Sequence, residues 1–522
     1  MSSPTRAAAL LGLIWLASCS LPDSGNDGPG PVVIIGIDGG AWTAIEELWS
    51  KGRLPNLQKL ANSGVTAELI PVADASPVIW TSMATGVVPE RHGITNFVVQ
   101  TDAGYVPVSS AVRRVPAIWT MVSTLERRVA VLGWWASWPA EDVNGVVVSD
   151  RLLGTADATF FPPQRTSEFR SIIDDEIDRG EVSPSETRIS RQDRAVAAFA
   201  RGTIASDYDL VLLYQRNVDA QSHQYWKYFR PATFDTVPQE ELQLFADRIP
   251  AAYDRVDQLL GDLLALANPR TTFFVVSDHG FYALKRPRSQ VSLDLDLVLE
   301  GLGYLERVDG STKWSNTAAV SWDTPLEARH KLVRLARADG DPRGMVNPDE
   351  VDSTRDRLTQ DLSELEYKTG KPVFYVREPR REEIGRGADI TAVIQSDGAT
   401  TDIYFNGRII PADVRIGQEI SGGHARGTKG IFIASGPIID SSAKPAAVHS
   451  LDITPTLLAA MGLPVAADFD GRPRIELFQN GFLEDYPLQT IASWGAPTDG
   501  QAIASDDDEA LIEELKALGY LD

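Results

Sequence analysis

Three aspartates and three histidines stand close to the ends of short apolar runs in the chain. They are Asp38, Asp219, His223, Asp278, His279 and His424. Asp219 and His223 are four residues apart and would share one face if their segment is helical. Singly, such residues are more often helix caps or hydrogen-bonded packing residues than ligands. Together, their carboxylate oxygens and imidazole nitrogens predict a site that suits zinc.

Ser76 is the candidate nucleophile. It precedes Pro77, a favourable first residue of a helix, and Gly86 is a favourable end for the same short segment. As the N-cap it would hold its oxygen at the positive end of the helix dipole, where phosphate groups also bind. A capped helix without a catalytic role explains the same pattern. Thr81 is the second candidate nucleophile, but it would lie in the middle of the helix.

The elements that must position these residues alternate between strands and helices. Continuous apolar runs predict buried strands at 32–37, 129–134, 146–148, 210–214, 272–277 and 430–434. Helices are predicted at 41–50, 55–63, 190–205 and 238–267. This alternation predicts an α/β fold, with a mainly parallel sheet flanked by helices. In such sheets ligands bind beyond the carboxyl ends of the strands, so the Asp and His residues are expected to converge there.

The pattern becomes more polar and less regular in the second half of the chain. We interpret this region as an inserted cap or lid, with a charged helix at 352–367 and His330 on another charged helix. An amphipathic helix is predicted after residue 505. The expected organisation is a core at 32–289 and 421–482, a cap at 290–420 and a C-terminal tail at 483–522.

The only cysteine, Cys19, closes an N-terminal export signal. Arg6 precedes an apolar stretch at 7–17 that is too short to span a bilayer. The sequence Leu16-Ala17-Ser18-Cys19 resembles a bacterial lipoprotein signal, although a secretory signal with an incidental cysteine is an alternative. We expect a signal peptide at 1–18, a flexible tether at 19–31 and a lipid on Cys19. The protein would then be an exported lipoprotein at the outer membrane, facing the periplasm or the cell surface.

The acidic composition narrows the classes of partner. The 522 residues include 49 Lys and Arg and 72 Asp and Glu, a net charge of −23. This balance argues against a nucleic-acid polymer as the partner. It does not exclude a small anionic substrate, because two bound cations and a helix N-terminus would set the local field.

Several motifs occur in an order that resembles the type I phosphodiesterase/nucleotide pyrophosphatase family of the alkaline phosphatase superfamily. They are Ile37-Asp38-Gly39, Ser76-Pro77, Thr85-Gly86, His92-Gly93, Asn217-Val218-Asp219, Ser222-His223, Ser277-Asp278-His279-Gly280, Gly423-His424 and Asp452-Ile453-Thr454-Pro455-Thr456. The resemblance implies an alkaline-phosphatase-like fold with two zinc ions. It implies one ion held by Asp219, His223 and His424. It implies another held by Asp38, Asp278, His279 and the Ser76 oxygen.

The resemblance also implies roles for two further positions. The family's nucleophile lies nine residues before the Thr of the Thr-Gly pair, and that position is Ser76 here. Asn96 is the nearest match to an Asn that donates to the phosphoryl oxygen, although it is one residue short of the expected spacing. His92 and His449 are interpreted as structural residues.

The expected function is hydrolysis of phosphodiester or nucleotide pyrophosphate bonds through a phosphoseryl intermediate. The substrate would be a small molecule or a lipid headgroup, and Tyr225, Trp226 and Tyr228 are either pocket or packing residues. A phosphomonoesterase on the same fold and a non-catalytic envelope binding protein remain as alternatives. A sulfatase is disfavoured, because Pro77 follows Ser76 directly and no Arg is nearby. A cofactor-independent mutase is not expected outside the cytoplasm.

Overall fold

The computed structural model describes most of the chain beyond the N-terminal segment. The described residues are 28–101, 104–179, 187–308, 311–322, 329–339, 344–385, 387–395, 401–425, 427–518 and 520. Cys19, the expected signal and most of the expected tether lie outside them. No helix among the described residues is long and apolar enough to cross a membrane.

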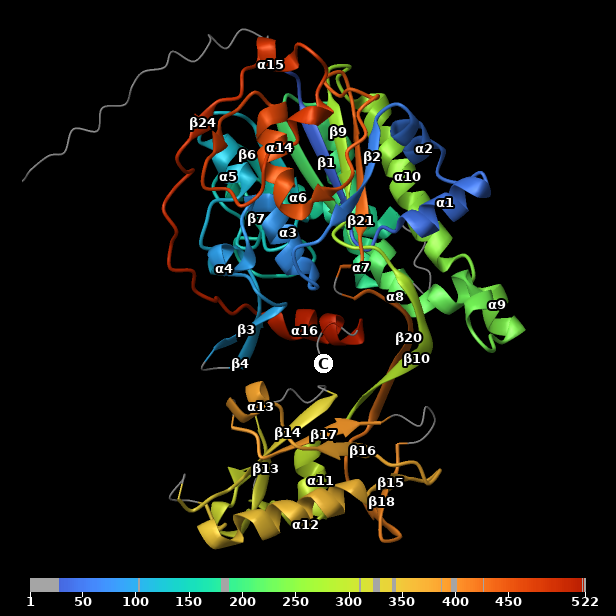
Figure 1. Ribbon diagram of the computed structural model, residues 1–522, viewed down its shortest axis with the longest axis vertical. Coiled ribbons are helices and arrows are strands. Elements are labelled where there is room, and N and C mark those ends of the chain that lie inside the picture. Colours follow the sequence, from blue (N-terminus) through green and yellow to red (C-terminus); the bar gives the residue numbers. More distant parts are fainter. Residues whose placement is uncertain are drawn as a thin grey trace, which may run out of the picture.

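A nine-stranded sheet forms the centre of the larger part of the molecule, which we call the core (Figure 1). Its strands are β1 (Val32–Ile37), β2 (Val65–Ile70), β5 (Val129–Leu132), β6 (Gly145–Val148), β7 (Phe160–Phe161), β8 (Leu210–Gln215), β9 (Thr272–Val276), β21 (Gly430–Ser435) and β22 (Val448–His449). Their order is β22-β2-β21-β9-β1-β8-β5-β6-β7. The central strands from β9 to β6 are parallel, whereas β21 and β7 run antiparallel to their neighbours. The predicted α/β fold with a mainly parallel sheet is confirmed.

Both faces of the sheet are buried by helices. Val33 and Ile35 of β1 pack into one hydrophobic cluster, whereas Val32 and Ile34 pack into another on the opposite face. The first cluster includes α1 (Trp42–Ser50), α2 (Pro55–Asn62), α6 (Thr166–Arg179), α7 (Arg188–Ile204), α8 (Asn217–Phe229) and α10 (Arg248–Leu266). The second includes α3 (Ser76–Thr85), α5 (Ile118–Ser123) and α14 (Ile453–Ala460). This two-sided burial explains why the strands are continuous apolar runs.

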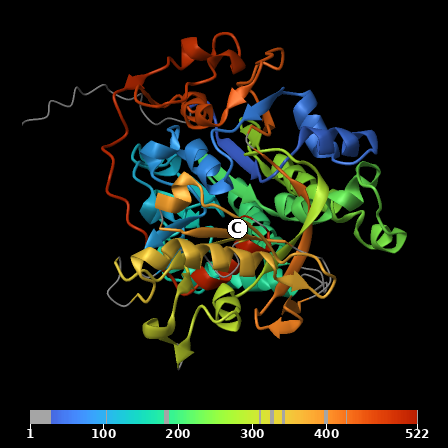
Figure 2. The ribbon, with the colours of Figure 1, turned by 60° about the horizontal axis from the view of Figure 1, so that its bottom comes forward.

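The region between the two parts of the core forms a cap with its own hydrophobic cluster, made only of residues from Val291 to Val414. Strands β10 (Tyr282–Ser292) and β20 (Arg415–Gly423) pair antiparallel and lead out to it. Its main sheet contains β13 (Ala319–Ser321), β14 (His330–Leu335), β17 (Ile390–Ile394) and β16 (Phe374–Arg377). It is flanked by α11 (Leu295–Gly301) and α12 (Val351–Ser363), and Figure 2 shows α12 lying across the outer side. The short strands are β11 (Arg307–Val308), β12 (Ser311–Thr312), β15 (Glu366–Tyr367), β18 (Ile403–Phe405) and β19 (Arg408–Ile410).

Some predicted elements differ from the structure. The helix expected around His330 is wrong, because His330 begins strand β14 and pairs with Val393 of β17. Successive buried residues, with Leu332 and Val333 facing opposite sides, suit a strand covered on both faces. The helix expected at 352–367 ends at Ser363, and β15 follows. The helix expected at 238–267 is divided into α9 (Gln239–Phe245) and α10.

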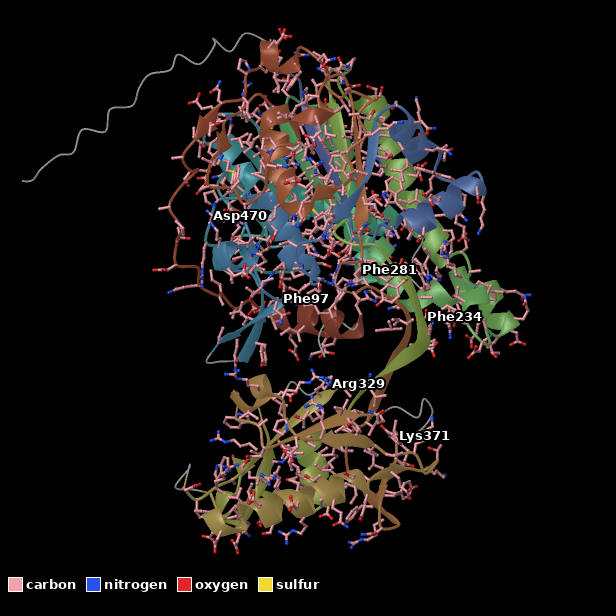
Figure 3. All side chains as sticks on the ribbon, in the orientation of Figure 1. Phe97, Phe234, Phe281, Arg329, Lys371 and Asp470 are labelled. Atoms are coloured by element: carbon pink, nitrogen blue, oxygen red, sulfur yellow. The ribbon has the colours of Figure 1, made fainter. Side chains whose placement is uncertain are left out.

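The C-terminal segment runs along the outside of the core before it forms α16 (Asp508–Ala517). In Figure 1 this last helix lies between the core and the cap, close to β3 (Val98–Thr101) and β4 (Gly104–Pro107). Figure 3 labels Phe97 and Phe281 on the side of the core that faces the cap. Helix α16 is therefore placed beside the carboxyl ends of the central strands.

Candidate active site

Neighbouring strands of the sheet bring the aspartates and histidines together. Asp38 follows β1, and Asp278 and His279 follow β9, which pairs with β1. Asp219 lies in the first turn of α8, directly after β8 on the other side of β1. Because these strands are parallel, their carboxyl ends meet at one edge of the sheet. His424 reaches the same place from the end of β20.

Ser76 begins helix α3 at this edge. The residue in the N-cap position is Ala75, so Ser76 is the first helical residue and not the cap that the sequence predicts. The helix ends as expected at Gly86, which has a left-handed backbone with φ of 71°. The completely buried Ser76 donates to Asp38 Oδ1 at 3.5 Å and lies 3.4 Å from His279 Nε2. The hydroxyl of Thr81 instead donates to the Pro77 carbonyl at 2.7 Å, so it is engaged within the helix.

Two groups of potential metal ligands share His279. Asp38, Asp278 and His279 form one group, in which His279 Nε2 lies 3.5 Å from Asp38 Oδ1 and 3.3 Å from Asp278 Oδ2. Asp219, His279 and His424 form the other, and the rings of the two histidines stack with centroids 3.6 Å apart. In each group the ligand atoms lie within 4.8 Å of one another.

His223 lies beside the second group, which consists of Asp219, His279 and His424. Its Nε2 is 3.5 Å from Asp219 Oδ1, and its ring centroid is 5.4 Å from that of His424. This arrangement follows from the predicted spacing of four residues on one helix, since α8 includes both Asp219 and His223. The resemblance implies His223 as a ligand beside Asp219 and His424, where the second group has His279.

Negative charge is concentrated in the buried site. Burial, followed by the charges of Asp278 and Asp219, raises the pKa of Asp38 well above its ordinary value. Burial and the charge of Asp219 raise the pKa of Asp278 to about 7. Burial and the neighbouring His279 and His223 lower the pKa of His424. Carboxylates that repel one another beside imidazole rings form an environment that a divalent cation would stabilise.

The hydrogen bonding of the site also fits metal ions. In the described part of the chain, no hydrogen-bond partner is present for five buried atoms: both carboxylate oxygens of Asp219, both ring nitrogens of His223 and Oδ2 of Asp278. Buried polar atoms of this kind require a partner, and oxygen and imidazole nitrogen atoms are ligands for Zn²⁺. His279 Nδ1 lies 3.1 Å from the Gly280 carbonyl, which favours Nε2 as its free nitrogen. The residues present therefore fit a dinuclear metal site.

Tyr214 is a residue of the site that the sequence did not single out. Its hydroxyl donates to Asp38 Oδ2, and Trp135 Nε1 donates to the Tyr214 oxygen at 2.6 Å. Tyr214 is the penultimate residue of β8, so the signal in the sequence is its position at the carboxyl end of an apolar run. The bond leaves Oδ1 of Asp38 directed toward Ser76 and His279.

Other candidates take up packing or local roles. Asn96 is exposed, and its Oδ1 accepts from the Phe97 N–H at 2.8 Å, a local contact that does not link it to Ser76. His92 is buried, with Nε2 2.9 Å from Ser82 Oγ, and His449 caps a short helix. Trp226 is buried and stacks on Phe281 with centroids 5.4 Å apart, as expected of a packing residue.

Comparison with known proteins agrees with the motif order. The type I phosphodiesterase/nucleotide pyrophosphatase family model matches residues 32–401. No curated protein sequence matches. Murine ectonucleotide pyrophosphatase/phosphodiesterase 5 is a similar solved structure, with 14% identity, a TM-score of 0.45 and coverage of 86% of this chain and 100% of that chain. An inactive form of that protein in complex with AMP has 15% identity, a TM-score of 0.44 and the same coverage.

A second kind of enzyme is also similar in structure. Phosphonoacetate hydrolase from Sinorhizobium meliloti 1021 has 16% identity and a TM-score of 0.42, with coverage of 83% of this chain and 95% of that chain. The match to the family model extends over most of the chain and includes most of the residues that form the site. The protein therefore belongs to the type I phosphodiesterase/nucleotide pyrophosphatase family and is a hydrolase of phosphate esters.

Proposed function

We propose that the protein hydrolyses phosphodiester or nucleotide pyrophosphate bonds with two Zn²⁺ ions and with Ser76 as the nucleophile. The observation that carries this proposal is the position of Ser76 Oγ, buried at the start of α3 and 3.5 Å from Asp38 Oδ1 and 3.4 Å from His279 Nε2. A hydroxyl at this place lies between the positive end of a helix and the group of potential metal ligands.

The chain's own residues would orient the reaction. Asp38, Asp278 and His279 would hold one ion, and Asp219, His223 and His424 would hold the other. Together the ions would act as Lewis acids and would lower the pKa of the Ser76 hydroxyl. Asp38 Oδ1 accepts the hydrogen bond of Ser76 and directs the oxygen for attack on phosphorus. Attack by the Ser76 oxygen displaces one alcohol or nucleotide, and Ser76 becomes esterified to the phosphoryl group, which keeps the substrate's other ester group. Water then cleaves the bond between the serine oxygen and phosphorus and releases that monoester. The N-terminus of α3 would stabilise the phosphoryl oxygens.

Cys19 would carry the lipid that anchors this activity to the membrane, with the tether separating the enzyme from the bilayer. This placement rests on the Leu16-Ala17-Ser18-Cys19 sequence alone. Labelling of cells with a radioactive fatty acid, compared between the native protein and Cys19→Ala, would test it. Loss of label in the variant is expected, and equal labelling of both forms would contradict it.

The reaction is tested by comparing rates on an activated diester, monoester and sulfate ester in the presence of Zn²⁺. We expect the diester to be the best substrate, Ser76→Ala to lose at least a thousandfold in kcat and the matched hydroxyl variant Thr81→Ala to retain most activity. Faster turnover of the monoester would assign the protein to the phosphomonoesterases. Activity that survives in Ser76→Ala and disappears in Thr81→Ala would contradict the assignment of the nucleophile.

A further inference from the structure

Arg216 is a buried cation at the edge of the candidate active site with unused hydrogen-bonding capacity. It directly follows β8, three residues before Asp219, and only 4% of its surface is exposed. Its Nη1 donates to Glu514 Oε1 of α16, whereas Nε and Nη2 are buried and have no hydrogen-bond partner among the residues that the structure describes. A buried guanidinium has five N–H donors in a planar fork that suits a carboxylate or a phosphate. Two of its three nitrogens therefore remain available for an anion.

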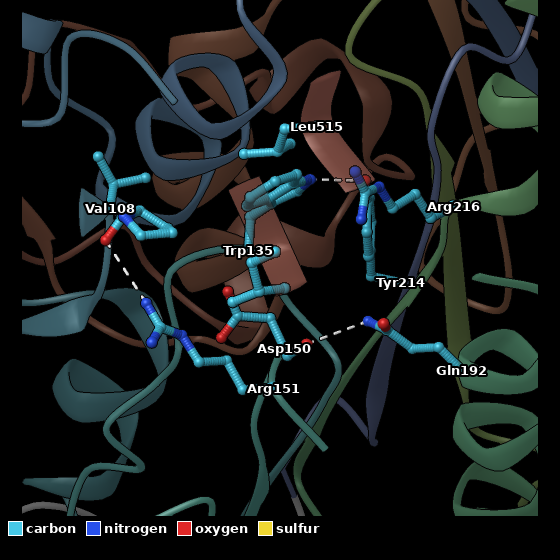
Figure 4. Close-up of a pocket in the computed structure, with 10 residues that line it drawn as sticks. Val108, Trp135, Asp150, Arg151, Gln192, Tyr214, Arg216 and Leu515 are labelled. Carbon is cyan, nitrogen blue, oxygen red and sulfur yellow. Dashed lines mark hydrogen bonds between the residues drawn. The ribbon is translucent and has the colours of Figure 1, made fainter. Parts of the chain in front are cut away.

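This arginine lines a pocket between the core and the C-terminal helix. Figure 4 shows Arg216 beside Tyr214 and Trp135, with Leu515 of α16 on the opposite wall. The guanidinium carbon lies 5.2 Å from the centroid of the Trp135 ring. The same Trp135 donates to Tyr214, whose hydroxyl in turn donates to Asp38. The pocket wall is thus linked by two hydrogen bonds to a potential metal ligand.

Tyr520 connects the pocket with the histidines of the site. Its ring centroid is 5.2 Å from that of His223 and 5.9 Å from the guanidinium carbon of Arg216. Its hydroxyl is also buried, and no described residue is its hydrogen-bond partner. Unpartnered donors on Arg216 and Tyr520 therefore occur side by side next to the candidate catalytic centre. A ligand that satisfied them would carry negative charge and acceptor oxygens.

The protein already places one carboxylate on this arginine. Glu514 of α16 pairs with Arg216, and its other oxygen accepts from Arg188 Nη1 at 3.2 Å. A second contact holds the same helix independently, because Asp508 Oδ1 accepts from the buried Arg151 at 2.7 Å. Glu514 could leave Arg216 while Asp508 keeps α16 attached to the core.

We propose that Arg216 determines specificity by binding a second anionic group of the substrate, a carboxylate or a phosphate beyond the scissile phosphoryl group, which takes the place of Glu514. This inference rests on the proposed function, because it concerns the substrate of that site. Exchange of one carboxylate for another anion keeps the buried guanidinium paired throughout, and this avoids the large cost of an unpaired buried charge.

Three p-nitrophenyl phosphodiesters that differ only in the second alcohol test the proposal. The alcohols are propan-1-ol, 3-hydroxypropanoate and 3-hydroxypropyl phosphate, so the second is a carboxylate and the third a phosphate. For the native protein with Zn²⁺ we expect kcat/KM to be at least tenfold higher for an anionic diester than for the propyl diester. The preferred anion identifies the natural chemistry, and the absence of any preference would overturn the proposal.

Two variants separate anion binding from attachment of the helix. Arg216→Gln should reduce the preference for the anionic diester at least tenfold, mainly through KM. Glu514→Gln should increase it at least threefold, because the competing carboxylate is removed. If the only role of Arg216 is to hold α16 in place, both variants release the helix, and the preference for the anionic diester changes in the same direction in both. That result would contradict the proposal. If Arg216→Gln does not fold, the sign of the change in Glu514→Gln decides alone.

Asp508→Asn is the matched control, since it weakens the attachment of α16 at Arg151 and leaves Glu514 in place. This variant should leave unchanged the ratio of kcat/KM for the anionic diester to kcat/KM for the propyl diester. An increase in this ratio equal to that of Glu514→Gln would overturn the proposal. If the native protein hydrolyses none of the diesters, the proposed function fails. In that event, calorimetric titration of the native protein with the same compounds tests the anion site separately. Tighter binding of an anionic diester than of the propyl diester, lost in Arg216→Gln, supports the anion site. Equal binding of the diesters contradicts it.

Discussion

At the scale of single residues, the unbalanced charge around Ser76 is the main feature of the site. Ser76 Oγ lies within 3.5 Å of Asp38 and of His279, and His279 belongs to both groups of potential metal ligands. The raised pKa of Asp38 and of Asp278 has the same cause, which is burial of several carboxylates together. A site that binds protons so readily in the folded state will exchange them for cations as the pH rises.

The pKa of Asp278 predicts how the stability of the metal-free protein depends on pH. The pKa is about 7 in the folded state, against an ordinary value of 3.8, so the folded protein binds this proton more tightly than the unfolded chain. The free energy of unfolding should therefore decrease between about pH 4 and pH 7 and remain low above that range. After chelation, we expect Asp278→Asn to reduce the fall in Tm between pH 5 and pH 8.

The control for this measurement is Asp207→Asn, because Asp207 is exposed and precedes the amino end of β8, the end opposite to the site. It should keep the pH dependence of the native protein. Addition of Zn²⁺ should raise the Tm of the native protein most at pH 8, where the carboxylates are free to bind metal. A fall in Tm between pH 5 and pH 8 that is equally large in Asp278→Asn would contradict the account of this carboxyl group.

At the scale of elements, strand ends were predictable because burial on both faces produces continuous apolar runs. The six potential ligands were found for that reason, since each lies beside such a run or on the helix that follows one. Strand β2 was not predicted, because its burial alternates and its sequence Val65–Ile70 contains Thr66 and Glu68. His330 was placed on a helix because Lys331 and Arg334 suggested a charged helix, yet Lys331 is buried in β14.

Tertiary contacts account for the rest of what the sequence could not predict. Tyr214 and Arg216 flank the end of β8, but their roles depend on Asp38 and on Glu514, which are far away in the chain. No local pattern connects residue 216 with residue 514. The position of α16 beside the site likewise depends on its ion pairs with Arg151 and Arg216, which are far from the helix in the chain.

The end of helix α3 permits a test of an element that positions the nucleophile. Gly86 has φ of 71°, and a Cβ at this position would lie 2.9 Å from Phe469. Gly86→Ala should therefore lower the free energy of unfolding by about 1–3 kcal/mol. Gly202→Ala is the matched control, because Gly202 lies in α7 with open space around it and should gain about 0.5–1 kcal/mol. Urea denaturation measures both changes, and equal effects would contradict the argument.

At the scale of the whole molecule, the core and the cap are joined by the paired strands β10 and β20. The hydrophobic cluster of the cap contains only residues between Val291 and Val414, and the two clusters of the core contain none of these. Two acidic residues attach α16 to the core. Asp508 pairs with Arg151, and Glu514 pairs with Arg216. Part of the net negative charge therefore serves to close one side of the site.

Separate hydrophobic clusters predict that the core folds without the cap. Ser292 pairs with Arg415 in the β10–β20 ladder, so an Asn-Gly turn that joins them would close a hairpin in place of residues 293–414. We expect the shortened protein to unfold cooperatively and to bind two Zn²⁺ ions, as measured by circular dichroism and elemental analysis. Loss of cooperative unfolding would show that the core depends on the cap.

The central claim is that Ser76 becomes phosphorylated during a metal-dependent reaction. Acid quenching during steady-state turnover of an activated diester, followed by proteolysis and mass spectrometry, tests it most directly. The account predicts that Ser76 of the Zn²⁺-loaded protein carries the phosphoryl group with the retained alcohol of the diester still attached, and that this adduct is absent after chelation or in Ser76→Ala. Turnover that continues with no adduct on Ser76, or with the adduct on Thr81, would contradict it.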